Sequence, residues 1–102
     1  MDNAILNAAL TLAMEWGPDA TKPLPERLLK QSPTLTAKEL DDYATAAQAA
    51  MKFGHDFVYK HPGCTGEKMT KALRAKYPWV SDDNASRVYS QGCYYAWKDG
   101  MM

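Results

Sequence analysis

Residues 36–60 read TAKELDDYATAAQAAMKFGHDFVYK, and this stretch decides the fold. It opens with Thr36 and Glu39 at the spacing of a capping box, in which the hydroxyl and the carboxylate each accept a hydrogen bond from a free amide at the start of a helix. Apolar residues then recur every three or four positions as far as Val58, as they do on one face of a helix. The stretch therefore predicts one long helix over residues 37–60.

The apolar face of this helix carries small side chains, namely Ala44, Ala47, Ala50 and Gly54. Small residues allow a second helix to approach closely. On the opposite face Lys52, Asp56 and Lys60 follow one another at intervals of four, which is typical of a solvent-facing surface. We therefore expect a close helix crossing at Gly54.

Proline and glycine separate this helix from four others. The first is expected over about residues 3–16, with Asp2 or Asn3 as its N-cap, Trp16 on its apolar stripe, and Gly17 and Pro18 ending it. A short helix over residues 25–31 begins at Pro25, because proline is favoured in a first turn.

Two further helices are expected over residues 67–77 and 82–98, capped by Thr65 and Ser81. No window shows the alternation of polar and apolar residues that marks a strand. The sequence thus predicts an all-α fold, a compact bundle of four main helices and one short helix in a single domain over residues 1–102.

The composition argues against two classes of function, nucleic-acid binding and membrane association. The 102 residues include 12 basic and 12 acidic side chains, so the formal net charge is zero, whereas dedicated nucleic-acid binders usually carry an excess of Lys and Arg. No segment approaches the roughly 18 consecutive apolar residues of a membrane span. The N-terminus also lacks the positive region of a signal peptide. We expect a cytoplasmic protein with reduced thiols and no membrane association.

The histidines and cysteines offer one pair at metal-ligand spacing, His61 and Cys64. Zinc sites usually combine two such pairs. Here His55 lies six residues before His61, about 120° away around a helix, and Cys93 is distant in sequence. Cys64 precedes a predicted helix N-terminus, which would favour a thiolate. A thiol-dependent or metal-dependent enzyme is therefore only the third interpretation of the sequence. The favoured interpretations involve no catalytic residues, no metal and no cofactor.

A second motif is AKYPWVSDDNASRV at residues 75–88, where Ala75, Val80, Ala85 and Val88 stand at characteristic intervals. Residues 71–90 resemble the helix-turn-helix of bacterial repressors, in which Val-Ser closes the turn and Ser-Arg lies in the recognition helix. The resemblance implies that the last helix enters the major groove of DNA. The DNA-binding residues would be Ser81, Asn84, Ser86 and Arg87.

Six of the eleven aromatic residues lie between Tyr77 and Trp97. On a helical wheel, one outer stripe of the last helix carries Arg87, Gln91, Tyr94 and Lys98. Tyrosine and arginine are enriched at protein interfaces. This stripe is therefore the candidate partner-binding surface.

Three functions remain. A helical protein-protein interaction module, with an unknown protein partner or self-association, is consistent with the zero net charge and the aromatic-rich last helix. A helix-turn-helix DNA-binding regulator is the alternative, although Asp82 and Asp83 at the start of the recognition helix would repel phosphates. The enzyme comes third, because no pair of titratable groups stands at a recognisable spacing.

Overall fold

The computed structural model describes residues 1–100, and within that range it contains five α-helices, one 3₁₀ turn and no strand. The elements in chain order are α1 (Asn3–Ala13), η1 (Pro18–Thr21), α2 (Leu24–Gln31), α3 (Ala37–Lys60), α4 (Gly66–Lys76) and α5 (Asp82–Lys98). The predicted all-α fold of four main helices and one short helix is confirmed. The bounds of α3 and α5 agree with the predicted ranges, and α2 and α4 each begin one residue earlier than predicted.

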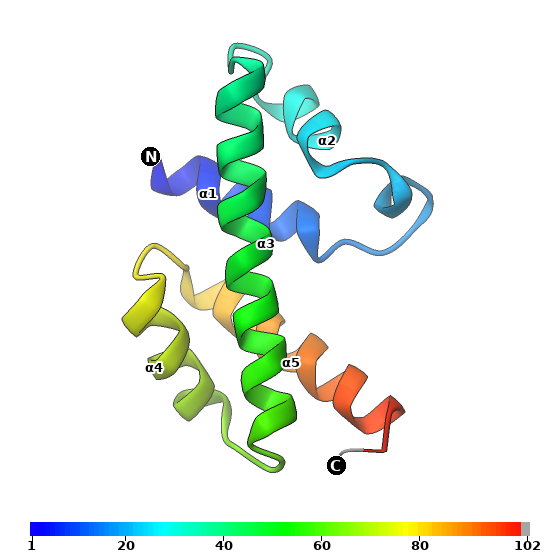
Figure 1. Ribbon diagram of the computed structural model, residues 1–102, viewed down its shortest axis with the longest axis vertical. Helices are drawn as coiled ribbons and strands as arrows, with labels where there is room; N and C mark the ends of the chain where they lie inside the picture. Colours follow the sequence, from blue (N-terminus) through cyan, green and yellow to red (C-terminus); the bar gives the residue numbers. More distant parts are fainter. Residues whose placement is uncertain (101–102) are drawn as a thin grey trace.

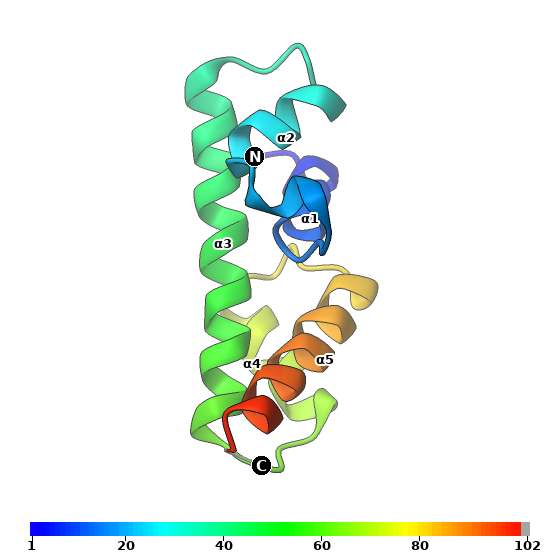
Figure 2. The same ribbon diagram turned by 90° about the vertical axis from the view of Figure 1, so that its right-hand side faces the viewer.

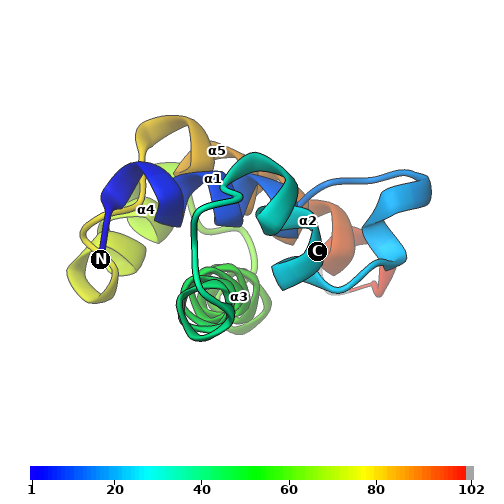
Figure 3. The ribbon, with the colours of Figure 1, turned by 90° about the horizontal axis from the view of Figure 1, so that it is seen from above.

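The 24-residue α3 runs the length of the molecule (Figure 1). The other helices all lie on one side of it, so that α3 forms one layer and α1, α2, α4 and α5 form the second (Figures 2 and 3). The N-terminal half of α3 contacts α1 and α2, and its C-terminal half contacts α4 and α5. The uncovered face carries the exposed Lys52–Asp56 ion pair. Within residues 1–100 no helix has the length and apolar character needed to cross a bilayer.

The predicted helix caps are present. The Thr36 hydroxyl accepts from the Glu39 amide at 3.1 Å, and the Glu39 carboxylate accepts from the Thr36 amide at 2.9 Å. The Thr65 and Ser81 hydroxyls cap α4 and α5 by accepting from the Lys68 and Asn84 amides. Asp2 is the N-cap of α1. These bonds satisfy amides that have no partner inside the helix, and they fix where each helix begins.

The end of α1 differs from the prediction. The helix stops at Ala13 rather than near residue 16, and Trp16 lies beyond it with 67% of its surface exposed. The last turn closes with a bond from the Glu15 amide to the Leu12 carbonyl at 3.2 Å, and Arg27 Nη1 donates to the same carbonyl at 2.6 Å. The chain then turns at Gly17, which has a φ of +116°. Trp16 therefore lies outside α1 and is not part of the apolar stripe that the sequence predicted.

The helices α3 and α5 cross in close contact. A Cβ atom on Gly54 would overlap Cγ1 of Val88, and one on Gly92 would lie 3.2 Å from Cγ2 of Val58. Each helix thus packs a glycine against a valine of the other helix. The close approach predicted at Gly54 is confirmed. On α5, Gly92 has the equivalent role, because it lies against Val58 of α3.

Candidate partner-binding hollow between α1 and α5

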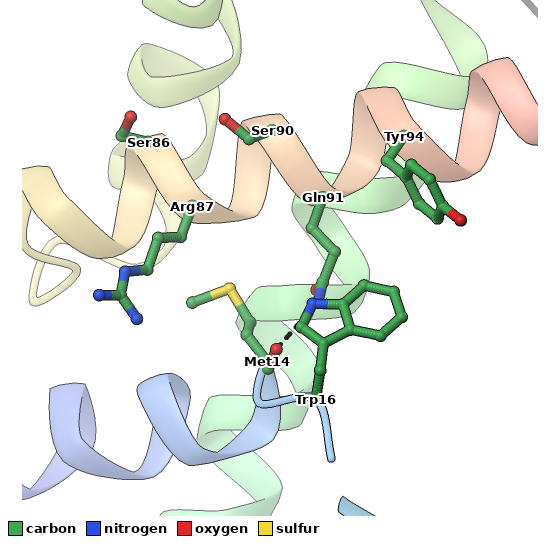
Figure 4. Close-up of a pocket in the computed structure, with 7 residues that line it drawn as sticks. All are labelled: Met14, Trp16, Ser86, Arg87, Ser90, Gln91 and Tyr94. Atoms are coloured by element: carbon green, nitrogen blue, oxygen red, sulfur yellow. Dashed lines mark hydrogen bonds between the residues drawn. The ribbon is translucent and has the colours of Figure 1, made fainter.

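A hollow of about 460 Å³ lies between the C-terminal end of α1 and one side of α5 (Figure 4). We call it the α1/α5 hollow. Two residues after the end of α1 and five on α5 line it: Met14, Trp16, Ser86, Arg87, Ser90, Gln91 and Tyr94. Met14 is buried, Gln91 is half-buried, and the other five are exposed.

The hollow contains three of the four residues of the predicted partner-binding stripe. Arg87, Gln91 and Tyr94 line it, whereas Lys98 lies in the last turn of α5 and is exposed outside it. The prediction that Gln91 stands on an outer, solvated face is wrong. Its Nε2 donates to the carbonyl of Met14 at 3.1 Å, because the end of α1 lies against this side of α5.

Trp16 and Tyr94 line one end of the hollow, and together with Tyr95 and Trp97 beside them they form an aromatic cluster. The Trp16 ring is perpendicular to that of Tyr94 and stacked on that of Tyr95, each at a centroid distance of 5.9 Å. Trp97 lies 6.4 Å from Tyr94 and is 68% exposed. Large aromatic side chains grouped at a surface mark a site where another molecule docks. The sequence predicted an exposed Tyr94 but placed Trp16 on the apolar stripe of the first helix, so it did not predict that the two rings meet.

The other end of the hollow is cationic. Arg87 is exposed, extends from α5 towards α1 in Figure 4, and makes no ion pair with any residue from 1 to 100. The other two arginines are engaged, since Arg27 bonds to carbonyls and Arg74 pairs with Asp82 at 2.5 Å. The Arg87 guanidinium therefore keeps its donors for an incoming group.

His55 of α3 lies beneath the aromatic cluster, with its ring 5.6 Å from that of Tyr95. Its Nε2 atom and the Oε1 atom of Gln91 are both buried, and neither has a hydrogen-bond partner among the described residues. Burial lowers the pKa of His55, an effect that the neighbouring Gln91 amide and the Asp56 carboxylate partly oppose. The ring is therefore neutral in the folded protein near pH 7.

This lowered pKa predicts a loss of stability in mild acid. The unfolded chain binds a proton at His55 near the ordinary value of 6.5, whereas the folded chain binds it only at lower pH. The stabilisation from a neutral His55 is thus complete above that value and is lost as the pH falls through it. We expect the free energy of unfolding, measured with urea, to fall between about pH 7.5 and about pH 5.5. In His55→Gln the fall should be smaller, and equal slopes in both proteins would contradict the assignment.

The residues implied by the helix-turn-helix resemblance lie in different environments. Ser81 is the N-cap of α5, and Asn84 is buried, with its amide donating to the carbonyl of Asn7 at 2.9 Å. Ser86 and Arg87 are exposed, and both line the α1/α5 hollow. The structure therefore leaves two of the four side chains free to meet a nucleic acid.

His61 and Cys64 border a separate hollow of about 350 Å³ in the loop between α3 and α4. His61 Nδ1 lies 3.0 Å from the carbonyl of Phe57. Residues 1–100 contain no group of three His, Cys, Asp or Glu side chains placed to hold a metal ion. Burial and the nearby Cys93 raise the pKa of the Cys64 thiol, so the thiolate expected ahead of the helix N-terminus is not favoured.

The comparisons with known proteins return no match: no family model, no curated protein and no solved structure is similar to this chain.

Proposed function

We propose that this protein is a small helical interaction module that binds a segment of another protein in the α1/α5 hollow. The observation that carries the proposal is the aromatic cluster at one end of that hollow, with Trp16 and Trp97 each about two-thirds exposed. Aromatic side chains of this kind supply most of the binding energy at many protein interfaces.

The openness of the hollow favours a protein segment over a small molecule. Small-molecule sites are concave and bury most of the ligand surface, whereas five of the seven side chains that line this hollow are exposed. A stretch of polypeptide lying across α5 would contact these side chains and remain in solvent on its other side. The free cysteines are compatible with a cytoplasmic setting, which we include in the proposal.

DNA binding through α5 is the alternative. It has less support, because the side chain of Asn84 is already engaged within the protein and Asp83 is exposed at the start of the helix. Random duplex DNA at low salt tests it directly. Binding that salt weakens steeply and Arg87→Glu removes would favour the regulator over the interaction module.

The interaction module is tested by selecting ligands from a display library of random dodecapeptides and measuring their affinity for variants. We expect Tyr94→Ala to weaken the selected peptides about tenfold or more, because it removes an aromatic contact from the hollow. The matched control is Leu29→Ala on α2, since Leu29 and Tyr94 are similarly exposed, at 42% and 46%. Equal affinities for the two variants would contradict the proposal, and selected peptides that are insensitive to Trp16→Ala would contradict it independently.

A further inference from the structure

We infer that the α1/α5 hollow selects a peptide segment in which an aromatic side chain is flanked by a carboxylate. This inference rests on the proposed interaction function and adds the chemistry of the partner. It is carried by the two unlike ends of the hollow: the guanidinium of Arg87, which makes no ion pair within the described residues 1–100, and the rings of Trp16 and Tyr94.

The cationic end is free because the nearby carboxylates are engaged elsewhere or stand apart. Asp82 is paired with Arg74 at 2.5 Å, and the Glu15 carboxylate lies 4.0 Å from Arg27. Asp83, one turn before Arg87 on α5, makes no ion pair with it. A guanidinium with free donors binds a carboxylate through two parallel hydrogen bonds, and this gives both strength and orientation.

Lys98 extends the same charge along α5. It is exposed, has no ion-pair partner among residues 1–100, and follows Arg87 by eleven residues, which is about 16 Å along the helix axis. The two cations therefore stand on either side of Tyr94. A ligand that crosses this stretch meets positive charge before and after its aromatic contact, so acidic residues on both sides of its aromatic residue are favoured.

The apolar part of the hollow is suited to a ring. The Met14 side chain lies between Arg87 and Trp16 in Figure 4, and thioether sulfur makes favourable contacts with aromatic edges. Trp16 and Tyr94 both line the hollow, and their rings are perpendicular to each other, with an interplanar angle of 88°. A third ring would find stacked or edge-to-face partners there, which an aliphatic side chain would not use.

Three pools of fluorescein-labelled eleven-residue peptides test the inference. Each pool has Trp at the centre and random residues elsewhere, except that the positions three residues to either side are fixed as Glu, Gln or Lys. We expect the Glu pool to bind the wild-type protein about tenfold more tightly than the Gln pool in fluorescence anisotropy, and the Lys pool to bind most weakly. In Arg87→Glu the order of the Glu and Lys pools should reverse.

The control for total charge is Lys71→Glu, which makes the same charge change at an exposed cation on α4 and should keep the wild-type order. Circular dichroism of each variant checks that the fold is retained. Amide chemical shifts of residues 14, 16, 87 and 94 report whether the peptides occupy the hollow.

The outcomes separate the inference from the proposed function. Glu and Gln pools that bind the hollow equally would overturn the carboxylate preference and leave the interaction module standing. A Glu preference that persists in Arg87→Glu would also overturn it. If no pool shifts the amides of residues 14, 16 and 94, both the inference and the proposed function are wrong.

Discussion

Gly54→Leu is expected to lower the free energy of unfolding by about 2–3 kcal/mol, as measured by urea denaturation. A side chain at this position would run into Val88, which is fully buried and, as a β-branched residue in a helix, has essentially one rotamer available. Met69 blocks a second direction, with its sulfur 3.4 Å from the Cβ position. Leucine has a higher helix propensity than glycine by about 1 kcal/mol. If the crossing were loosely packed, Gly54→Leu would therefore raise the free energy of unfolding.

A matched substitution on the same helix isolates the crossing. Gln48 is exposed on α3, so Gln48→Leu should leave the melting temperature close to that of the wild type. The contact with Val88 is tested by a smaller change in two backgrounds. Gly54→Ala should destabilise the wild type but should stabilise Val88→Ala, where the overlapping methyl group is gone and helix propensity decides the sign. A variant Gly54→Leu that melts with the wild type would contradict the tight α3/α5 crossing.

Asn7→Ala is expected to cost about 2–3 kcal/mol of unfolding free energy, because it leaves partly buried polar groups without partners. The Asn7 amide donates to the carbonyls of Asn3 and Trp79, at 2.9 and 2.8 Å. Its oxygen accepts from the Ser81 amide at 2.9 Å and from Asn84 at 3.0 Å. All four hydrogen-bonding positions of the side chain are therefore used, and they join α1 to the turn between α4 and α5.

The control for Asn7 is Asn3→Ala, which removes the same side chain from an exposed position one turn earlier on α1. We expect its free energy of unfolding, measured by thermal denaturation, to change by no more than about 0.5 kcal/mol. In the Asn7 variant, amide exchange at Ser81 should accelerate more than exchange within α3, since that amide loses its acceptor. Equal stabilities of the two variants would show that the Asn7 bonds are replaced by water.

The sequence was sufficient for the helices because the signals that specify them are local. The capping box at Thr36 and the caps at Thr65 and Ser81 lie within three residues of the groups they satisfy. The periodicity of α3 and α5 was read correctly for the same reason, and it placed Arg87 and Tyr94 on one surface.

The errors arose where a distant residue decides the local structure. The helix α1 ends at Ala13, where the distant Arg27 donates to the Leu12 carbonyl and the chain turns away at Gly17, so Trp16 does not join the predicted stripe. Gln91 lies on the outer stripe of an isolated α5, but in the protein the end of α1 covers it. Asn7 interrupts an apolar stretch, and nothing within α1 indicates that Trp79 and Ser81 complete its hydrogen bonds.

The sequence by itself therefore determined the number and order of the helices, where most of them begin, and that a side chain at Gly54 would prevent close packing. Only the tertiary structure decided that Trp16 meets Tyr94 at one end of a hollow, that Arg87 makes no ion pair within residues 1–100, and that Gln91 bonds to Met14. The physical reason is the range of the interactions. Caps and helical periodicity act within one or two turns, whereas the α1/α5 hollow forms from side chains more than seventy residues apart, whose meeting depends on how the helices cross.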